Sequence, residues 1–395
     1  MNKDVVILSG VRTAVGDFGG ALKDFAPSKL GEIVIREAIT RARLEPADIQ
    51  HVVLGQVIPT VPQDAYLARV AALNAGVPVE APALTLNRLC GSSVQAIVSA
   101  AQMITLGECD IAVAGGAESM SRSPHYVTAA RFGQKMGPVA MLDALTATLS
   151  DPIDDYHMGI TAENVAERYQ ISREAQDAAA AESHARATRA QAEGRFKDQI
   201  IPVEVKTRKG MVAFDTDEHV RADADLAAMA KLKPAFKKDG TVTPGNASGI
   251  NDGAAAVVLA SADAAAAKGL KPMAKILGWA HAGVSPDVMG LGPIHAVPTA
   301  LKRAGLSLDQ IDVIESNEAF AAQACAVAQE LGFDPEKVNI NGSGISIGHP
   351  VGATGAMLTV KALYELERSG GTYGLVTMCI GGGQGIALVI ERMAA

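Results

Sequence analysis

The sequence predicts an α/β protein built from two similar halves with an inserted segment between them. Short apolar runs at residues 5–8, 51–54 and 111–114 are typical of buried strands. They alternate with amphipathic helical patterns at 30–43 and 93–106. At 395 residues the chain exceeds the size at which one core usually keeps growing, so more than one domain is expected.

The same rhythm returns near the C-terminus, which indicates a duplication. Helical patterns and apolar runs recur there, at 297–304 with 313–314 and at 356–366 with 375–378. The helix after Cys90 is matched, at a shift of about 260 residues, by the helix after His349. A chance likeness of two strand–helix–strand units is the alternative. We favour duplication, because helix, linker and strand recur in one order at nearly one offset. Two halves packed about a pseudo-twofold axis bring Cys90 and His349 towards one centre.

Residues 121–249 interrupt this rhythm and are predicted to form an inserted, more exposed loop domain. They hold a polar helical stretch at 172–194 and a basic stretch at 206–238, with eight Lys or Arg and five Asp or Glu. The basic stretch is either a solvated face or a docking site for a polyanionic small molecule such as a nucleotide-bearing cofactor. The predicted domains are an N-terminal half at 1–120 completed by 250–271, the insert at 121–249, and a C-terminal half at 272–395.

The composition is that of an ordinary globular protein and argues against several classes. A net charge of −8 argues against a nucleic-acid-binding surface. The start lacks the apolar segment of a secretory signal, and we identify no apolar run of the ~18 residues that span a bilayer. Cys90, Cys109, Cys325 and Cys379 lie far apart, which argues against a disulfide framework or a zinc site. We expect a cytoplasmic protein that binds no membrane, nucleic acid or metal.

Cys90 stands where a loop enters a predicted helix, in the segment Asn-Arg-Leu-Cys-Gly-Ser-Ser. Free backbone N–H groups and the helix dipole at that position favour a thiolate, and they stabilise an oxyanion once an acyl group is attached. Taken alone, Cys90 is equally well explained as an inert buried cysteine. A second thiol and an imidazole in similarly distinctive segments favour a nucleophile.

His349 lies between Gly348 and Pro350 in a glycine-rich turn, which leaves little bulk around the imidazole. Such a turn suits a base towards a thiol or an oxyanion donor. A lone histidine is more often structural. We assign that structural role to His51, His184, His219 and His295.

Cys379 follows an apolar strand-like run and precedes the glycines at 381–383, where missing side chains let a thioester lie against the backbone. The alternative is a phosphate-binding glycine loop, but the Lys-Ser/Thr that should follow it is absent. Asn317 is either a turn residue or a polar group that holds a water for a carbonyl oxygen. Spacing alone does not choose between these two roles.

Several blocks of the chain resemble the signature sequences of thiolases, and in the correct order they cover essentially its whole length. The catalytic blocks are Asn-Arg-Leu-Cys-Gly-Ser at 87–92, Asn-Glu-Ala-Phe-Ala-Ala-Gln at 317–323, Gly-His-Pro-Val-Gly-Ala-Thr-Gly at 348–355 and Cys-Ile-Gly-Gly-Gly-Gln-Gly at 379–385. Further matching blocks lie at 9–13, 114–120, 157–164 and 245–249.

The resemblance implies a five-layered αβαβα fold of two duplicated halves with an inserted loop domain, assembled as a homo-oligomer, most often a tetramer. It also implies a ping-pong Claisen condensation of acyl-CoA with acetyl-CoA and the reverse thiolytic cleavage. Coenzyme A is then substrate and carrier, and no cofactor is permanently bound. No metal is required.

In that scheme Cys90 takes the acyl group, His349 activates Cys90, and Cys379 moves the proton at C2 of the second acyl-CoA. His349 with a water on Asn317 forms one oxyanion hole, and the N–H groups of Cys90 and Gly381 form the other. The residues carried over to the coenzyme A path are His157, Met158, Arg221, Ser248, Met289 and Phe320.

Three departures from the familiar thiolase pattern lie near the predicted site. Asn-Gly-Ser-Gly-Ile-Ser stands at 341–346 in place of Asn-Gly-Gly-Ala-Ile-Ala, Met357 replaces an arginine, and Ser93 replaces a glycine. The first departure resembles bacterial β-ketothiolases that also accept somewhat longer acyl chains. We therefore expect short-chain substrates, acetoacetyl-CoA and somewhat longer ones.

Three other functions fit parts of the sequence. A decarboxylating β-ketoacyl synthase shares the fold, but a histidine is expected where Cys379 stands. A non-catalytic acyl-CoA- or lipid-binding protein on this scaffold is expected to lose one of Cys90, His349 and Cys379, and all three are present. A cysteine hydrolase leaves Cys379 unused. A Cys90–Cys379 disulfide formed on mild oxidation is a further hypothesis.

Overall fold

The computed structural model describes residues 3–208 and 210–393. Lys209, which belongs to the predicted basic stretch, lies outside the described residues, as do the outermost ends of the predicted domains. A large mixed sheet forms the framework. Its strands run in the order β15 (Val313–Ser316), β16 (Tyr373–Ile380), β17 (Gln384–Arg392), β14 (Ala274–Gly283), β1 (Val5–Thr13), β13 (Asn251–Ser261), β5 (Ile111–Ser119), β3 (His51–Gly55) and β4 (Ala83–Leu86).

This order is symmetric about the junction of β1 and β14, which pair at Val6 with Lys275 and at Ile7 with Ala274. On each side of the junction the next strand is antiparallel, β13 beside β1 and β17 beside β14. The two strands that follow run parallel to each other, β5 with β3 and β16 with β15. The strand order therefore confirms the predicted duplication.

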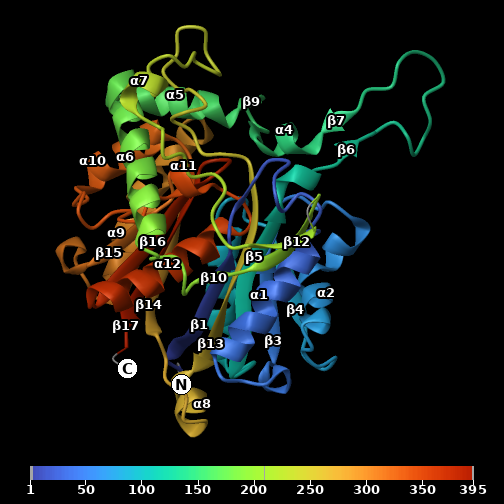
Figure 1. Ribbon diagram of the computed structural model, residues 1–395, viewed down its shortest axis with the longest axis vertical. Helices are drawn as coiled ribbons and strands as arrows, with labels where there is room; N and C mark the ends of the chain where they lie inside the picture. Colours follow the sequence, from blue (N-terminus) through green and yellow to red (C-terminus); the bar gives the residue numbers. More distant parts are fainter. Residues whose placement is uncertain (1–2, 209, 394–395) are drawn as a thin grey trace.

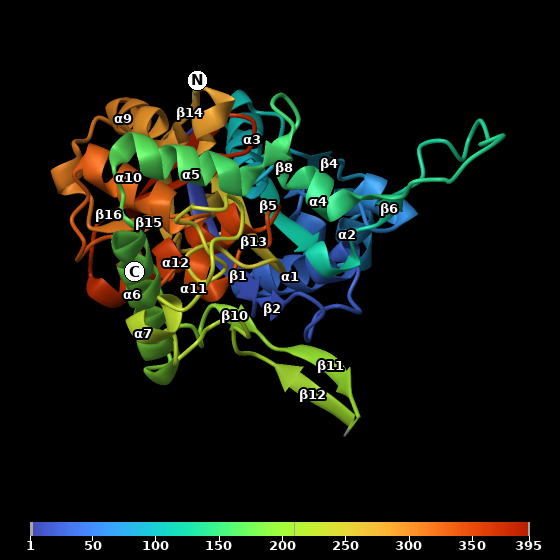
Figure 2. The same cartoon turned by 90° about the horizontal axis from the view of Figure 1, so that it is seen from above.

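Helices complete the layers (Figures 1 and 2). Helices α3 (Ser92–Leu106) and α12 (Thr354–Ser369) lie between the two halves of the sheet and contact strands of both. Helices α1 (Pro27–Arg41) and α2 (Leu67–Asn74) cover the outer face of the N-terminal half, and α9 (Gly292–Ala304), with α10 (Ala321–Leu331) beside it, covers the C-terminal half. The result is the predicted five-layered αβαβα arrangement.

The central helices meet at their N-termini. The backbone N–H of Ala356 in α12 donates to Ser93 Oγ in α3 at 2.9 Å, so the serine that departs from the familiar pattern joins the two halves. A Cβ on Gly355 would lie 2.4 Å from Val94 Cγ2, so glycine is needed for this approach. As predicted, the duplication brings the segments of Cys90 and His349 to one centre.

The expectation that no apolar run is long enough to span a bilayer is wrong. By length and composition the segment Leu89–Leu106, which contains α3, is apolar enough to cross a membrane. It is 56 % buried within the fold, because sheet and helix pack on several of its faces. A helix that other elements cover on several faces has a wide apolar surface, and this explains its composition.

The inserted segment is tied to the body rather than free. Strand β10 (Ile200–Ile201) pairs with β1, and α5 (Met158–Tyr169) and α6 (Arg173–Ala192) pack on α10 and on α11 (Gly344–Ile347). An arm between β6 (His125–Tyr126) and β7 (Leu142–Asp143) stands away from the body (Figures 1 and 2). The other named elements there are α4 (Ala144–Thr148), β8 (Ser150–Asp151), β9 (Tyr156–His157), β11 (Val203–Thr207), β12 (Gly210–Phe214) and α7 (Leu226–Met229). Outside the insert lie β2 (Gly16–Asp17), which pairs with β13, and α8 (Ala262–Ala267).

Candidate active site

A cavity of about 580 Å³ lies where the two halves meet the insert. Its lining is mostly apolar, with a few polar groups, which is the usual character of a small-molecule site. Two predicted catalytic residues, Cys379 and Asn317, are buried and are not among its lining residues. The predicted residues that do line it are Cys90, His349, Gly381, His157, Met158, Arg221, Ser248, Met289 and Phe320.

The loop before α3 holds Cys90 through its own side chains. Ser92 Oγ accepts from the N–H of Arg88 at 2.9 Å and donates to the carbonyl of Leu89 at 2.6 Å. Asn87 Oδ1 accepts from the N–H of Leu89 at 2.8 Å. Leu89 has a φ of +46°, a left-handed conformation that a bulky residue rarely adopts. Strain of this kind persists where surrounding bonds enforce it, and here they fix the residue before Cys90.

The backbone N–H groups of Gly381 and of Cys90 itself lower the pKa of the Cys90 thiol. Burial outweighs both groups and raises the pKa of Cys90 to about 11. This corrects the expectation that the helix start alone favours a thiolate. A Cβ on Gly381 would lie 3.1 Å from Met158 Cε and 3.2 Å from Leu89 Cδ1, so a larger residue would press on both side chains.

The turn of His349 fixes both position and tautomer of the imidazole. Its backbone N–H donates to Asn251 Oδ1 at 2.9 Å. Nδ1 lies 2.7 Å from Thr354 Oγ1, and that hydroxyl gives its only proton to the carbonyl of Pro350 at 2.9 Å. Nδ1 therefore carries the ring proton and donates to Thr354, which leaves Nε2 unprotonated. Burial lowers the pKa of His349 to about 4, so the ring is a neutral base at ordinary pH.

Asn317 lies against this imidazole. Its Nδ2 is 3.3 Å from His349 Nε2, and its Oδ1 has no partner among the described residues. A buried amide oxygen without a partner marks a place for a water or a substrate group. The side chain therefore suits the water-holding role better than that of a simple turn residue.

Cys379 lies inside β16, next to its last residue, rather than after a strand as the sequence suggested. It is fully buried, and burial together with the nearby Cys90 charge raises its pKa. Cys90 and Cys379 are both free in the structure, and their oxidation to a disulfide stays a prediction.

The cavity wall formed by the insert carries aromatic and charged groups. The His157 ring stacks on Phe236 with centroids 4.6 Å apart. Arg221 Nη2 lies 2.9 Å from Asp17 Oδ2, and His219 Nδ1 lies 2.5 Å from Asp17 Oδ1. His219 was expected to be structural only, but it lines the cavity. The hydrogen-bonding contact with Asp17 explains why a polar imidazole is held there.

The sequence analysis missed several of these groups. Asn251 and Thr354 lie beside or within matched blocks, so the blocks themselves were a signal for them. Glu118 also lies in a matched block. It accepts from the N–H groups of Val57, Ile58 and Gly352, and burial raises its pKa to about 8. Asp17, Phe236 and His219 lie outside every block, and only the folded chain shows them at the cavity.

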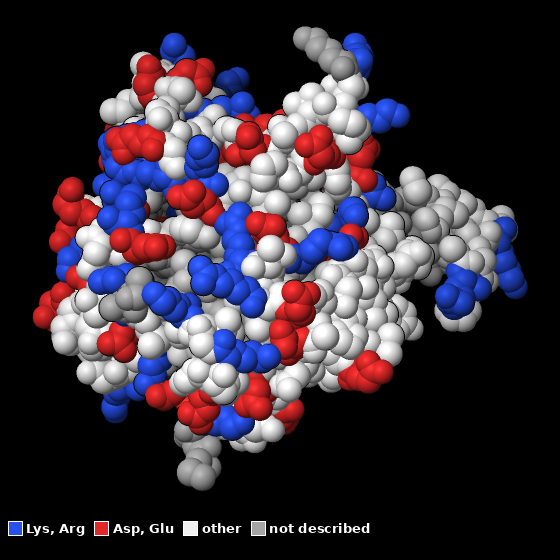
Figure 3. Space-filling view, turned by 60° about the horizontal axis from the view of Figure 1, so that its bottom comes forward, with Lys and Arg blue, Asp and Glu red and all other residues white. Residues whose placement is uncertain are grey.

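The basic stretch divides between the two interpretations. Arg221 lines the cavity, whereas the other described Lys and Arg of that stretch are not among its lining residues. Figure 3 shows Lys and Arg mingled with Asp and Glu over one face of the molecule. A solvated face therefore describes most of the stretch, whereas Arg221 faces the cavity. Within the parts of the chain that the structure describes, no three His, Cys, Asp or Glu are grouped to hold a metal.

A thiol, a neutral imidazole and convergent N–H groups in one apolar cavity are what acyl transfer through a cysteine thioester requires. The chain belongs to the thiolase family: residues 5–263 match the family model "Thiolase, N-terminal domain" and residues 270–392 match "Thiolase, C-terminal domain". It is an acyltransferase, which catalyses the reversible Claisen condensation of acyl-CoA with acetyl-CoA and the thiolytic cleavage of the product.

Named relatives agree with this assignment. The chain is 61% identical over 394 residues to beta-ketothiolase BktB of Cupriavidus necator, covering 100% of both chains. It is 50% identical to acetyl-CoA acetyltransferase of Chromobacterium violaceum, covering 98% and 100%. Among solved structures, Bacillus anthracis acetyl-CoA acetyltransferase superimposes with a TM-score of 0.97 at 47% identity, covering 99% of each chain. Human mitochondrial 3-ketoacyl-CoA thiolase in complex with CoA gives 0.97 at 43%, covering 99% and 98%.

Proposed function

We propose that this thiolase works by a ping-pong mechanism in which Cys90 carries the acyl group as a thioester. The observation that supports it is the convergence of Cys90, the N–H of Gly381 and the His349 imidazole on one cavity. Nε2 of His349 accepts the thiol proton as the Cys90 sulfur attacks the acyl carbonyl. The N–H groups of Cys90 and Gly381 hold the resulting oxyanion. His349 then returns the proton to the sulfur of coenzyme A, which leaves.

In the second half-reaction Cys379 first passes its own proton to Nε2 of His349, and the thiolate then removes a proton from C2 of acetyl-CoA. The enolate oxygen that forms is held by the Nε2–H of the protonated His349 and by a water on the Asn317 amide. The carbanion attacks the acyl-Cys90 carbonyl, and the Cys90 sulfur, which leaves as the carbon–carbon bond forms, takes the proton from His349. A buried thiol with a raised pKa is a strong base once deprotonated, which fits removal of a weakly acidic C–H.

The wall formed by the insert suits coenzyme A. Arg221 offers a cation to the phosphates, and the apolar side chains of Met158, Met289 and Phe320 line the path of the pantetheine arm. His157 and Ser248 supply polar groups along it. The human relative was solved in complex with CoA, which supports the same ligand here. No cofactor is permanently bound.

The preferred substrates are short 3-ketoacyl-CoA thioesters, acetoacetyl-CoA and somewhat longer ones. Support comes from the apolar groups beside the thiol, Val57, Leu89, Met120 and Leu149, and from the beta-ketothiolase relative. The test is thiolytic cleavage of acetoacetyl-, 3-ketovaleryl- and 3-ketohexanoyl-CoA, with Cys90→Ala as the control. We expect cleavage of all three, lost in the variant. Cleavage of acetoacetyl-CoA alone would contradict the wider range, and no cleavage of any would contradict the activity.

The chain works as a homo-oligomer, most consistently a tetramer. Two unpartnered surfaces support this: the edge strand β4, with Leu84 39% exposed, and the arm between β6 and β7, where Phe132 is 91% and Met136 is 86% exposed. We place the enzyme in the cytoplasm. We also keep the domain division at 1–120 with 250–271, at 121–249 and at 272–395, and sedimentation analysis of the purified chain tests the assembly.

A further inference from the structure

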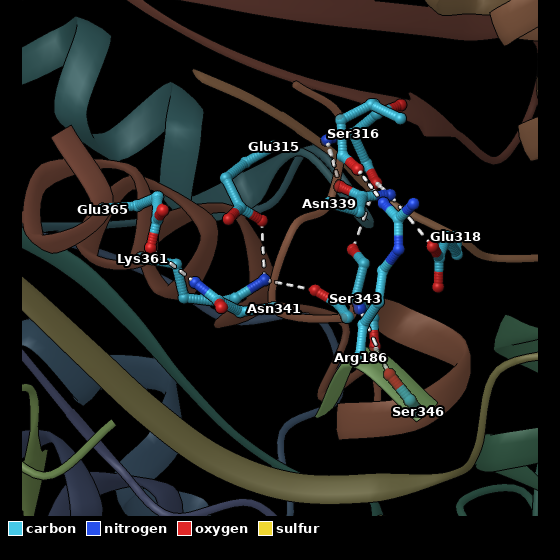
Figure 4. Close-up of polar contacts among 12 residues, drawn as sticks. Arg186, Glu315, Ser316, Glu318, Asn339, Asn341, Ser343, Ser346, Lys361 and Glu365 are labelled. Atoms are coloured by element: carbon cyan, nitrogen blue, oxygen red, sulfur yellow. Dashed lines mark hydrogen bonds and ion pairs between the residues drawn. The ribbon is translucent and has the colours of Figure 1, made fainter. Parts of the chain in front are cut away.

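A row of buried, hydrogen-bonded polar side chains leads to Glu318, which follows Asn317 in the sequence. Its members are Ser183 in α6, Ser346 in α11 and Glu318, and Figure 4 labels Ser346 and Glu318. None of them lines the catalytic cavity. Ser183 and Glu318 instead line a separate cavity of about 170 Å³. The mechanism described above uses none of these side chains.

The direction of each hydrogen bond in this row follows from the chemistry of the groups. Ser183 Oγ lies 2.6 Å from Glu318 Oε2 and 2.8 Å from Ser346 Oγ. A carboxylate oxygen accepts and a hydroxyl has one proton to give, so Ser183 donates to Glu318 and accepts from Ser346. The other oxygen of Glu318 accepts from Asn339 Nδ2 at 2.9 Å. Ser346, Ser183 and Glu318 are therefore connected to one another by hydrogen bonds without a break.

At one end these hydrogen bonds hold both neighbours of Asn317 in place. Glu318 follows it, and Ser316 precedes it. Asn339 Oδ1 accepts from the N–H of Ser316 at 2.9 Å, and Asn339 Nδ2 donates to the Ser316 carbonyl at 2.8 Å. A Cβ on Gly344 would lie 2.6 Å from Asn317 Oδ1, so the amide is also closely packed. The Asn317 side chain has little freedom to turn.

At the other end these hydrogen bonds lead to Ser346, in the segment just before the turn of His349. Ser346 lies three residues before His349, and its Oγ accepts from the N–H of Ser343 at 3.2 Å, which holds the start of α11. The Asn317 amide and the His349 imidazole, 3.3 Å apart, therefore stand on two segments that Ser183 joins through Glu318 and Ser346. Helix α6 of the insert thus ties the two segments together.

We propose that Ser346, Ser183 and Glu318 form a positioning network that fixes the Asn317 amide against the His349 imidazole. This inference rests on the function proposed above, in which that amide and imidazole hold the enolate oxygen. The N–H groups of Cys90 and Gly381, which hold the other oxyanion, are not bonded to this network. The network therefore supports the carbon–carbon bond step more than acyl exchange between Cys90 and coenzyme A.

Two rates of the purified full-length enzyme test this. One is thiolytic cleavage of acetoacetyl-CoA, and the other is exchange of the acetyl group between acetyl-CoA and labelled coenzyme A. In Ser346→Ala we expect the kcat of cleavage to fall about tenfold, as for one lost positioning hydrogen bond, with KM and the exchange rate within about twofold. Ser183→Ala should behave in the same way. The double variant should be little worse than either single one, because both residues belong to the same hydrogen-bonded network.

Ser9→Ala is the matched control, since Ser9 is buried and donates to the Ala38 carbonyl at 2.7 Å in the other half of the molecule. It should leave both rates near those of the unmodified enzyme. An equal fall of both rates in Ser346→Ala and Ser183→Ala, or no fall in cleavage, would overturn the network. An unmodified enzyme that shows neither reaction would instead overturn the proposed function itself.

Discussion

The two halves of this molecule share one scaffold but supply different chemistry to the site. In the N-terminal half the loop before α3 carries Cys90, and in the C-terminal half the loop before α12 carries His349. The equivalent strands β5 and β16 end in a buried carboxylate, Glu118, and in a buried thiol, Cys379. Duplication supplied two helix starts that meet at one point. In the proposed mechanism one half is the acyl carrier and the other is the source of bases.

The difference between the two halves is tested most strongly by removing the Cys90 thiol from the N-terminal half. In Cys90→Ala we expect both thiolytic cleavage and acetyl exchange to fall by about 10⁴-fold, because both reactions pass through the Cys90 thioester. Cys109→Ala is the matched control, since that thiol is also in the N-terminal half but does not line the cavity. Exchange that survives the loss of Cys90 would show that another group carries the acyl chain.

The pH dependence of thiol alkylation sharpens the contrast between the two halves. Because the pKa of Cys90 is raised to about 11, its thiolate fraction grows about tenfold per pH unit below that value. Iodoacetamide labelling of Cys90 should therefore rise by about 10³-fold between about pH 7 and about pH 10. No inflection is expected near pH 6.5, the ordinary value for histidine, because the pKa of His349 is lowered to about 4.

Mass spectrometry of the labelled peptides measures both thiols together. Cys379, whose pKa is raised by burial and by the nearby Cys90 charge, should label more slowly than Cys90 at every pH. A labelling rate that levels off near neutral pH would mean a resting thiolate, and the proton-transfer role of His349 would then be unnecessary.

The packing of the two halves against each other can be disturbed by one added methyl group. A Cβ on Gly116 in β5 would lie 2.1 Å from the carbonyl oxygen of Gly352 in the turn after His349. We expect Gly116→Ala to lower the free energy of unfolding by about 3 kcal/mol, measured by urea denaturation, because backbone must shift. Gly283→Ala meets nothing within 4 Å and should change stability by less than about 0.5 kcal/mol. Equal effects would mean that the halves do not meet as closely as described.

The smallest effect is expected at Arg221 in the insert, which we propose contacts the phosphates of coenzyme A. Arg221→Ala should raise KM for acetoacetyl-CoA about tenfold with kcat nearly unchanged, because it removes a phosphate contact remote from the reacting atoms. The same variant should leave the kinetics of a pantetheine thioester, which lacks the nucleotide, unaltered. Lys231→Ala, a basic residue of the same stretch outside the cavity lining, is the control. A large fall in kcat would place Arg221 in the chemistry instead.

The sequence was sufficient to predict the two halves, the insert and the elements that carry Cys90 and His349. Those predictions came from local periodicity and from the recurrence of the same pattern at a shift of about 260 residues. It also predicted that Arg221 belongs to the site, because the residue lies in a basic stretch and matches a family position.

What the sequence could not show was the effect of packing between distant segments. The helix start favours a thiolate at Cys90, but the walls that desolvate it come from Gly381, Met158 and His349, far along the chain. The imidazole of His349 lies against Asn317, 32 residues earlier, and His219 lies at the cavity beside Asp17. In each case the partner residue lies far away in the sequence, and only the folded structure shows that it lies at the site.

The division of labour between the halves is tested most directly in Cys379→Ala. The variant protein is incubated with acetyl-CoA, and the acetylated peptide is identified by mass spectrometry while acetyl exchange and thiolytic cleavage are measured alongside. We expect one acetyl group on Cys90, exchange close to that of the unmodified enzyme, and cleavage of acetoacetyl-CoA reduced by about 10³-fold. Cleavage that survives in this variant, or an acetyl group on any residue other than Cys90, would contradict the account.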